Sequence, residues 1–236
     1  MQVSEIKSRI ENYKERGLKL FTTSSFQTHS MVMLHILSNI DNTIPVYFIH
    51  TGYHFQETIA YRDLITKRFN LNLINVFSAT SKINQRDTQG HLLFASDPDS
   101  CCNLNKVSPL EPILAAHDIW INGVRADQGE LRKNFDVEQK AKYGTIRFHP
   151  MLNWNGKMIY DYIREHNIPK HPLEEKGYFS IGCEPCTRKW ETEAESRGGR
   201  WFGLKKFECG LNTDLVEKAP APSLPARPPE PERAGA

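Results

Sequence analysis

The chain has 236 residues, of which 39% are hydrophobic and 25% are charged, and its formal net charge is +2. This composition is typical of a folded globular protein and excludes wholesale disorder, a collagen-like repeat and a coiled coil. The length allows one large domain or two small ones. Because the net charge is so small, nothing in it calls for a nucleic acid or an acidic membrane surface as partner, and any basic site must be local.

The chain carries no sign of export or membrane insertion. No apolar run approaches the roughly 20 residues that span a bilayer, and residues 1–5 lack the basic start and apolar stretch of a secretory signal. We therefore expect a cytoplasmic protein. In that compartment its five cysteines are expected to be reduced thiols that bind a metal or take part in redox chemistry, rather than a disulfide framework.

Short apolar runs alternate with helical patterns from the N-terminus onward. The predicted strands and further apolar runs cover residues 18–23, 45–50, 71–77, 112–117 and 119–123, and the predicted helices cover 31–40, 55–69 and 157–166. This alternation predicts an α/β domain with a mainly parallel central sheet flanked by helices. Ligands of such sheets lie beyond the carboxyl ends of the strands. The loops after Thr23, His50, Phe77 and Gly123 are therefore candidate binding loops.

The end of the chain differs in composition from the rest. Residues 216–236 hold six prolines together with Ala, Glu and Arg, and such a segment cannot bury much apolar surface. We expect a disordered tail without a catalytic role, either a natural extension or a cloning addition. The folded domain is expected to cover residues 1–215.

The loop that follows the first predicted strand, residues 21–30, is rich in hydroxyl groups. Backbone N–H groups and hydroxyls at a helix N-terminus bind anions, although Ser and Thr can equally serve to cap the helix. The loop resembles a degenerate PP-loop, the Ser-Gly-Gly-x-Asp-Ser motif of nucleotide-α-hydrolases, with Phe26 in place of a glycine and Thr28 or His29 in place of the acidic residue. Without that carboxylate it is poorly equipped to hold magnesium for ATP cleavage, but it can still hold a nucleotide phosphate.

Four of the cysteines form two close pairs, Cys101-Cys102 and Cys183-x-x-Cys186. Two thiol pairs on separate loops suit zinc or an iron–sulfur cluster. Adjacent cysteines strain a single zinc site but can reach different corners of a larger cluster, so the pattern favours a [4Fe–4S] cluster over zinc, and over four unligated buried thiols.

The fifth cysteine, Cys209, stands apart, near Lys205 and Lys206 and just before Gly210. Nearby lysines raise the thiolate fraction of a thiol, and glycine adds backbone freedom. These features are compatible with a nucleophile on a short segment that moves as a lid, and also with an ordinary surface cysteine near the end of the domain.

Several motifs together resemble one family, the sulfonucleotide reductases, over about residues 18–212. They are Trp-Ile-Asn-Gly-Val-Arg-Ala-Asp-Gln at 120–128, His149-Pro150 followed by Trp154, Gly-Tyr-Phe-Ser-Ile-Gly-Cys-Glu-Pro-Cys-Thr at 177–187, Gly-Arg-Trp at 199–201 and Glu-Cys-Gly-Leu at 208–211. The resemblance implies a PP-loop, Rossmann-like fold with a mobile C-terminal catalytic segment over 188–215.

The two cysteine pairs are similar to those of the cluster-containing branch of this family, which typically reduces adenosine 5′-phosphosulfate. The resemblance therefore implies that Cys101, Cys102, Cys183 and Cys186 bind a [4Fe–4S] cluster and that Lys106 places its ammonium near the cluster and the substrate. Lys106 alone would look like a solvated helix residue. Use of 3′-phosphoadenosine 5′-phosphosulfate, or of both nucleotides, stays open.

The resemblance also implies a mechanism and a biological setting, which are sulfate assimilation and cysteine biosynthesis. Cys209 attacks the sulfur of the nucleotide and expels AMP, which leaves an S-sulfocysteine. Thioredoxin or a glutaredoxin-like protein then releases sulfite by thiol exchange. Neither nucleic acid nor membrane is expected as a partner, and a homo-oligomer stays open.

The remaining implied site residues bind the anionic substrate. Arg197 and Arg200 match the substrate-binding arginines of the family, and Arg125 and Lys106 complete the cationic set, although each arginine could instead be a surface charge. Ser24 and Ser25, with the N–H groups of residues 26 and 27, are expected to contact the α-phosphate. The loop 50–53 is expected along the adenosine, and Asp127 and Gln128 either bind or shape their loop.

Two departures from the family pattern limit how far the residue roles of the family apply to this chain. The closing motif has Phe207 where the family has Thr and Asn212 where it has His, which removes a possible acid/base or charge partner of Cys209. The phosphate loop also differs from both common forms. The rival classes are a PP-loop tRNA-thiolating enzyme, a sulfate adenylyltransferase subunit and a non-catalytic protein that carries a cluster.

Overall fold

The computed structural model describes residues 1–190, 198–203, 206 and 208–216. A six-stranded sheet runs through the centre with strand order β3-β2-β1-β4-β6-β5. Its strands are β1 (Leu20–Thr23), β2 (Val46–His50), β3 (Leu73–Phe77), β4 (Ile119–Ile121), β5 (Glu138–Lys140) and β6 (Ile146–Phe148). All neighbours pair in parallel except β5, which runs antiparallel to β6 at the edge. The predicted fold class is confirmed.

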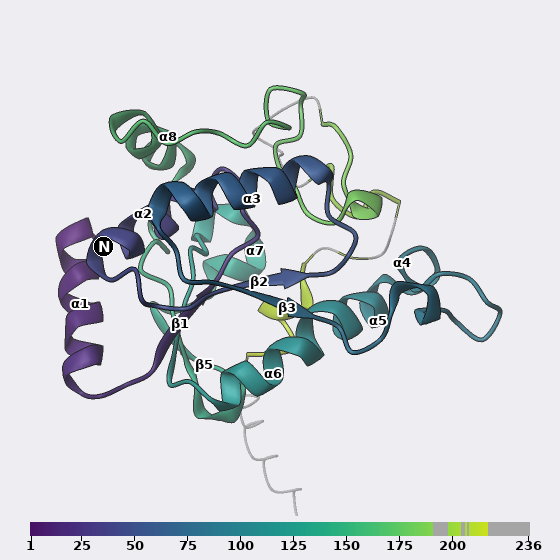
Figure 1. The fold of residues 1–236 in the computed structure, drawn as a ribbon, viewed down its shortest axis with the longest axis horizontal. Coiled ribbons are helices and arrows are strands. Elements are labelled where there is room, and N and C mark those ends of the chain that lie inside the picture. The colour runs from purple at the N-terminus through teal and green to yellow at the C-terminus, as the bar shows by residue number, and fades with distance from the viewer. Residues whose placement is uncertain (191–197, 204–205, 207, 217–236) are drawn as a thin grey trace, which may run out of the picture.

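Helices cover both faces of this sheet (Figure 1). The α-helices are α1 (Val3–Glu15), α2 (Ser30–Ile40), α3 (Gln56–Phe69), α4 (Leu93–Ser96), α5 (Pro98–Cys102), α6 (Ser108–Ala115), α7 (Glu130–Lys133) and α8 (Gly156–Glu165). One core contains buried side chains of α1, α2, α3 and α8, and a second core on the opposite face contains those of α6.

The alternation of side chains along the strands explains why both faces are apolar. Leu20 of β1 and Ile121 of β4 belong to the first core, whereas Phe21 and Trp120 belong to the second. Successive residues of a strand point to opposite faces, so a strand buried on both sides reads as a continuous apolar run. This is why the sequence located β1, β2 and β4 well.

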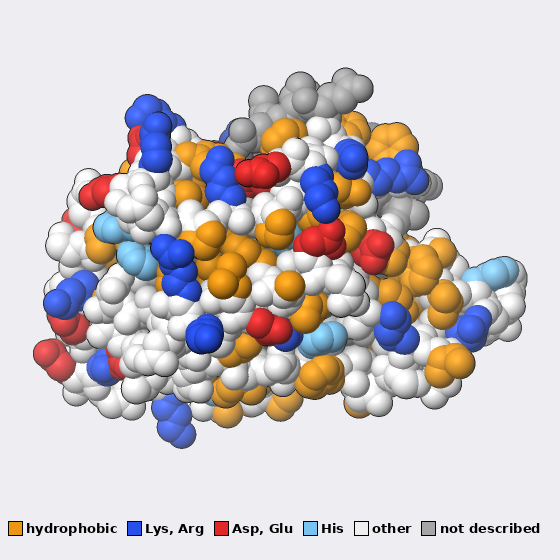
Figure 2. Space-filling view, turned by 45° about the horizontal axis from the view of Figure 1, so that its top comes forward, with side chains coloured by type: hydrophobic (Ala, Val, Ile, Leu, Met, Phe, Trp, Pro, Cys, Tyr) orange, Lys and Arg blue, Asp and Glu red, His pale blue; other side chains and the backbone are white. Residues whose placement is uncertain are grey.

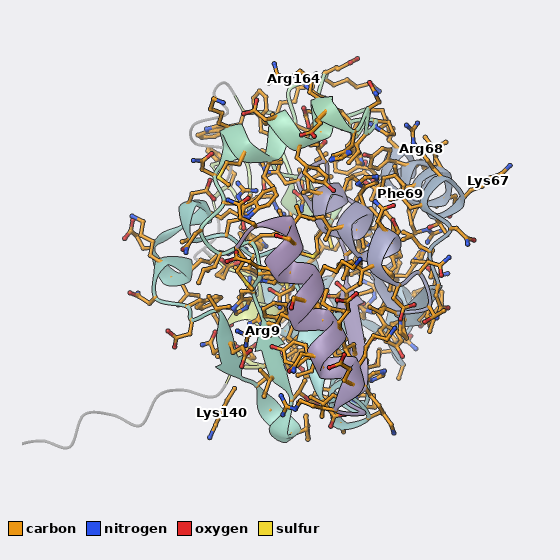
Figure 3. All side chains as sticks on the ribbon, turned by 90° about the vertical axis from the view of Figure 1, so that its left-hand side faces the viewer. Arg9, Lys67, Arg68, Phe69, Lys140 and Arg164 are labelled. Atoms are coloured by element: carbon orange, nitrogen blue, oxygen red, sulfur yellow. The ribbon has the colours of Figure 1, made fainter. Side chains whose placement is uncertain are left out.

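Several elements were not predicted, namely helices α1, α4, α5 and α7 and strands β5 and β6. Helix α1 lies across the sheet next to its β5 edge, and Figure 3 shows it facing the viewer with Arg9 labelled. Arg9 Nη1 and the hydroxyl of Tyr13 both donate to Glu138 Oε1, each at 2.5 Å. The predicted apolar run at 112–117 belongs mostly to α6, and the run at 119–123 ends as a strand at Ile121.

The described C-terminal part packs on the body of the protein. Leu215 is fully buried in the core under α6, and Val216 forms a bridge with Ala141. The predicted tail beyond Val216, residues 217–236, lies outside the described residues. No helix in the described part of the chain has the length and apolar character to cross a membrane.

Candidate active site

A cavity of about 670 Å³ opens beyond the carboxyl ends of β1, β2 and β4. Of the predicted substrate and catalytic residues, the structure brings six to this cavity: Ser24, Ser25, Lys106, Arg125, Arg200 and Cys209. Arg197 lies outside the described residues. The position agrees with the rule that parallel sheets bind ligands at the carboxyl ends of their strands.

The loop after β1 takes a left-handed turn at Phe26, where φ is +53°. That conformation usually falls to glycine, and Phe26 adopts it with its ring fully buried against Phe48. Its N–H donates to Ser24 Oγ at 3.1 Å. Core packing therefore holds the turn that a glycine would otherwise allow.

Gln27 connects this loop to the segment that carries two of the cysteines. Its Nε2 donates to Ser25 Oγ at 3.0 Å, and its Oε1 accepts the N–H of Ile181 at 3.0 Å. Cys183 lies two residues further along. The loop with Ser24 and Ser25, here called the serine loop, and the segment with Cys183 and Cys186, here called the cysteine segment, are thus fixed relative to each other across the cavity.

Arg125 is buried at the cavity wall, with an exposed fraction of 4%. Its guanidinium donates to both carboxylate oxygens of Asp127, at 2.9 and 3.2 Å, and lies 3.1 Å from Nδ1 of His29. Burial, and then the charge of Arg125, lower the pKa of His29 to about 4. His29 is therefore neutral at pH 7, and Asp127 orients Arg125.

The four paired cysteines line a second, small cavity together with Lys106, which lines both cavities. Cys101 and Cys183 belong to one buried cluster of side chains, and partly buried Cys186 packs against it. A π-helical turn, Asn103–Val107, joins α5 to α6, and turns of this kind are frequent at functional sites. It brings Lys106 Nζ to 3.7 Å from Cys102 Sγ.

The charges around these thiols favour anionic sulfur at one of them. Burial, followed by the neighbouring thiols, raises the pKa of Cys101 to about 11. Burial also acts to raise the pKa of Cys183, but Lys106 and the hydroxyl of Thr51, 3.3 Å from its Sγ, bring it below the usual value. Four thiols in one cavity beside a lysine are a donor set that suits an iron–sulfur cluster.

No group of three or more His, Cys, Asp and Glu side chains in the described residues is arranged to hold a single metal ion. A four-iron cluster makes a different demand, because each thiolate binds a different iron and the four sulfurs do not converge on one point. The gathering of all four cysteines around one small cavity fits that demand.

Arg200 lines the larger cavity and contacts the segment that carries Cys183 and Cys186. Its Nε donates to the carbonyl oxygen of Cys186 at 3.3 Å, and its guanidinium stacks on the ring of Trp201 at 4.5 Å. It packs so closely on Gly182 that a Cβ there would overlap the guanidinium. Arg200 is thereby aimed along the cysteine segment and into the larger cavity.

Two arginines that sequence reasoning missed hold the segment around Cys209. Arg132 donates to both carboxylate oxygens of Glu208, at 2.8 and 3.0 Å. Arg147 donates to Asn212 Oδ1 at 2.8 Å and to the carbonyl oxygen of Leu211 at 3.3 Å. One signal was available, because Arg147 is a charged residue inside the short apolar run of β6.

The buried histidines make stability depend on pH. His149 and His171 are fully buried, and burial lowers the pKa of each to about 4. In the unfolded chain these histidines bind protons near pH 6.5. The contribution of the neutral, buried rings to the free energy of unfolding is therefore fully present above that pH and is lost as the pH falls toward 4. Between pH 7 and 5.5 we expect the free energy of unfolding to fall by about 1 kcal/mol for each histidine.

Urea titrations at the two pH values check this expectation, with His149→Asn as the comparison variant. The variant should lose less free energy of unfolding than the wild type over the same interval. Equal stability of the wild type at pH 7 and 5.5 would contradict the buried, neutral state of these rings.

The fold and the cavity define an α/β protein with serine, arginine and cysteine side chains at the carboxyl ends of its strands, and the comparisons with known proteins give the family. The model of the phosphoadenosine phosphosulfate reductase domain matches residues 19–189. The adenosine 5′-phosphosulfate reductases of Bacillus cereus strain Q1 and Bacillus cytotoxicus are each 37% identical over 202 residues, which is 85% of this chain and 86% of theirs. The chain belongs to the phosphoadenosine phosphosulfate reductase family.

Solved structures agree on the fold. The phosphoadenylyl-sulfate reductase of Candida auris, a phosphate complex, has a TM-score of 0.60 at 23% identity and covers 70% of this chain and 81% of its own. The FMN adenylyltransferase of Candida glabrata has a TM-score of 0.57 at 15% identity and covers 86% of this chain and 72% of its own.

Proposed function

We propose that this protein reduces adenosine 5′-phosphosulfate to sulfite and AMP in sulfate assimilation, with a thioredoxin-like protein as reductant. The observation that carries the proposal is the placement of Cys209 in the same cavity as the serine loop, Lys106 and Arg200. The Bacillus relatives that bear the name of this activity cover most of the chain.

The reaction proceeds in two exchanges at sulfur. The Cys209 thiolate attacks the sulfuryl sulfur, an S–S bond forms, the bond from sulfur to the phosphate oxygen breaks, and AMP leaves with that electron pair. A thiolate of the reductant then attacks Cys209 Sγ and sulfite leaves with the electron pair of the S–S bond. The second thiol of the reductant resolves the mixed disulfide, and the reductant ends oxidised.

The cationic wall of the cavity stabilises the charge that moves in the first step. Negative charge grows on the phosphate as AMP departs, and preorganised donors at such a point usually supply the largest catalytic effect. Arg125 is held by Asp127, and Arg200 by Trp201 and the backbone of Cys186, so neither must reorganise. The guanidinium of Arg200 suits sulfate and phosphate oxygens, whereas Arg125 already binds Asp127 through Nε and Nη2.

We infer that Cys101, Cys102, Cys183 and Cys186 hold a [4Fe–4S] cluster. When bound, the cluster would supply an electrostatic centre beside the larger cavity, and Lys106 lines both that cavity and the one with the cysteines. The support is the convergence of both cysteine pairs on one small cavity.

Replacing Cys186 with serine should therefore lower the iron and acid-labile sulfide of anaerobically purified protein and bleach its visible absorption. Cys209→Ser is the matched control, because Cys209 does not line the small cavity, and it should keep the iron of the wild type. Equal iron in both variants would contradict the assignment of the ligands.

The rival classes need features that the cavity does not favour. An enzyme that cleaves ATP needs carboxylates for magnesium, whereas Asp127 and Glu208 at the cavity wall are each held by an arginine. A tRNA-modifying enzyme needs a broad basic surface, whereas Lys and Arg are interspersed with acidic and uncharged side chains on the face in Figure 2.

The experiment that tests the function compares the two sulfonucleotides with reduced thioredoxin under anaerobic conditions. Sulfite and the nucleotide product are measured together. We expect equal amounts of sulfite and AMP, and a kcat/KM higher for adenosine 5′-phosphosulfate than for its 3′-phosphorylated form. A preference for the 3′-phosphorylated nucleotide would reassign the substrate, and no sulfite from either would overturn the proposal.

A further inference from the structure

Cys209 sits on a short turn whose two ends are tied to different parts of the body. Glu208 precedes it and Asn212 ends the 3-10 turn Gly210–Asn212 that follows. Glu208 pairs with Arg132 of α7, and Asn212 pairs with Arg147 of β6. The turn with Cys209 is therefore anchored on both sides by buried arginines, whose exposed fractions are 8% and 1%.

The two anchors are linked to each other through the turn itself. Asn212 Nδ2 donates to Glu208 Oε1 at 3.2 Å, and the same oxygen accepts the backbone N–H of Cys209 at 2.8 Å. Glu208 Oε1 thus accepts hydrogen bonds from the backbone of Cys209, the side chain of Asn212 and the guanidinium of Arg132. This small network fixes the direction of the Cys209 backbone.

Arg147 is built rigidly into the sheet. Its guanidinium lies 4.4 Å from the centre of the Trp120 ring and 5.6 Å from that of Phe135. From this position it donates to both Leu211 and Asn212, the last residues of the turn. A lysine would keep the charge but lose the planar fork and the stacking.

We propose that Arg147 and Asn212 are positioning residues that clamp the Cys209 turn over the cavity. The asparagine in place of the family histidine then has a defined role, because its amide accepts from Arg147 and donates to Glu208 at the same time. Neither residue exchanges protons or electrons with the substrate. The clamp deepens the proposed function, since it acts through the same thiol.

The clamp is tested by the access of a bulky maleimide to Cys209 in the holoenzyme without substrate, with peptide mapping to assign the label. We expect Asn212→Ala and Arg147→Lys to raise the labelling rate about tenfold, as the loss of one charge-assisted hydrogen bond predicts. Thr213→Ala is the matched control, because exposed Thr213 bonds to its neighbour Asp214, and it should label like the wild type. The double variant should label no faster than the quicker single one.

A second readout follows the thiol with substrate present. At saturating nucleotide, the rate of adduct formation should fall in Asn212→Ala by about tenfold, the effect of a small misplacement, while the nucleotide concentration for half the maximal rate stays unchanged. If Arg147→Lys fails to fold, Asn212→Ala decides alone. Unchanged labelling in a folded Asn212→Ala protein overturns the clamp. If Asn212→Ala labels faster but the wild type forms no adduct with the nucleotide, only the proposed function is overturned.

Discussion

Replacing Cys209 with serine is expected to reduce sulfite release to the background of the uncatalysed reaction. Serine keeps the size and the neighbours of the side chain, but a hydroxyl without an adjacent base is a weak nucleophile at neutral pH. No other cysteine can substitute, because the four remaining thiols of the chain lie in two pairs assigned to the small cavity. The loss should therefore appear in kcat.

Steady-state sulfite production with reduced thioredoxin measures this effect, and two controls make it decisive. The variant should keep the far-UV circular dichroism and the iron content of the wild type, and it should still bind AMP. Sulfite production at the wild-type rate by Cys209→Ser would remove the nucleophile from the mechanism.

Exchange of Lys106 for glutamine is expected to lower kcat by about 100- to 1,000-fold, the usual effect of removing a charge-stabilising group. Lys106 lines both cavities and lies 3.7 Å from Cys102 Sγ. Burial acts to lower the pKa of its ammonium, but Cys183, Cys209 and Cys102 outweigh burial and raise it, so that the group is cationic at neutral pH. The variant removes that charge from the point where the nucleophile, the substrate and the cysteine cavity meet.

Lys142→Gln is a suitable comparison for this variant. Lys142 is partly exposed, pairs with Glu111 and lines neither cavity, so its kcat should equal that of the wild type. The iron content of Lys106→Gln is measured in parallel. A loss of iron would show that the variant disturbs the cysteine cavity, whereas a lower kcat with unchanged iron would show an effect on the reaction itself. Unchanged kcat with unchanged iron would show that Lys106 does not act on the reaction.

The fold was predictable where burial leaves a strong pattern in the sequence. Strands β1, β2 and β4 are apolar on both faces, and each appears as a continuous run. Strands β5 and β6 lack such a run, because β5 reads Glu-Gln-Lys and β6 has Arg147 between its two apolar residues. Helix α1 buries only Ile6, Ile10 and Tyr13 among many charged residues, so its pattern was weak.

The site shows the same division between local and long-range information. The paired cysteines, the serine loop and Arg200 belong to short motifs, and motifs can be recognised in a sequence. Arg132 and Arg147 acquire their roles from Glu208 and Asn212, partners more than sixty residues further along the chain. Such pairings depend on which strand edge meets which turn, and they follow only from the folded structure.

The central claim is that Cys209 takes up the sulfo group of the nucleotide, and intact mass spectrometry tests it most directly. Wild-type protein is incubated anaerobically with adenosine 5′-phosphosulfate and no reductant, and Cys209→Ser is treated in the same way. The account predicts a gain of one sulfo group on Cys209 in the wild type, with an equal amount of AMP released, and no gain in the variant. Protein that holds its iron and yet shows neither adduct nor AMP would contradict the account.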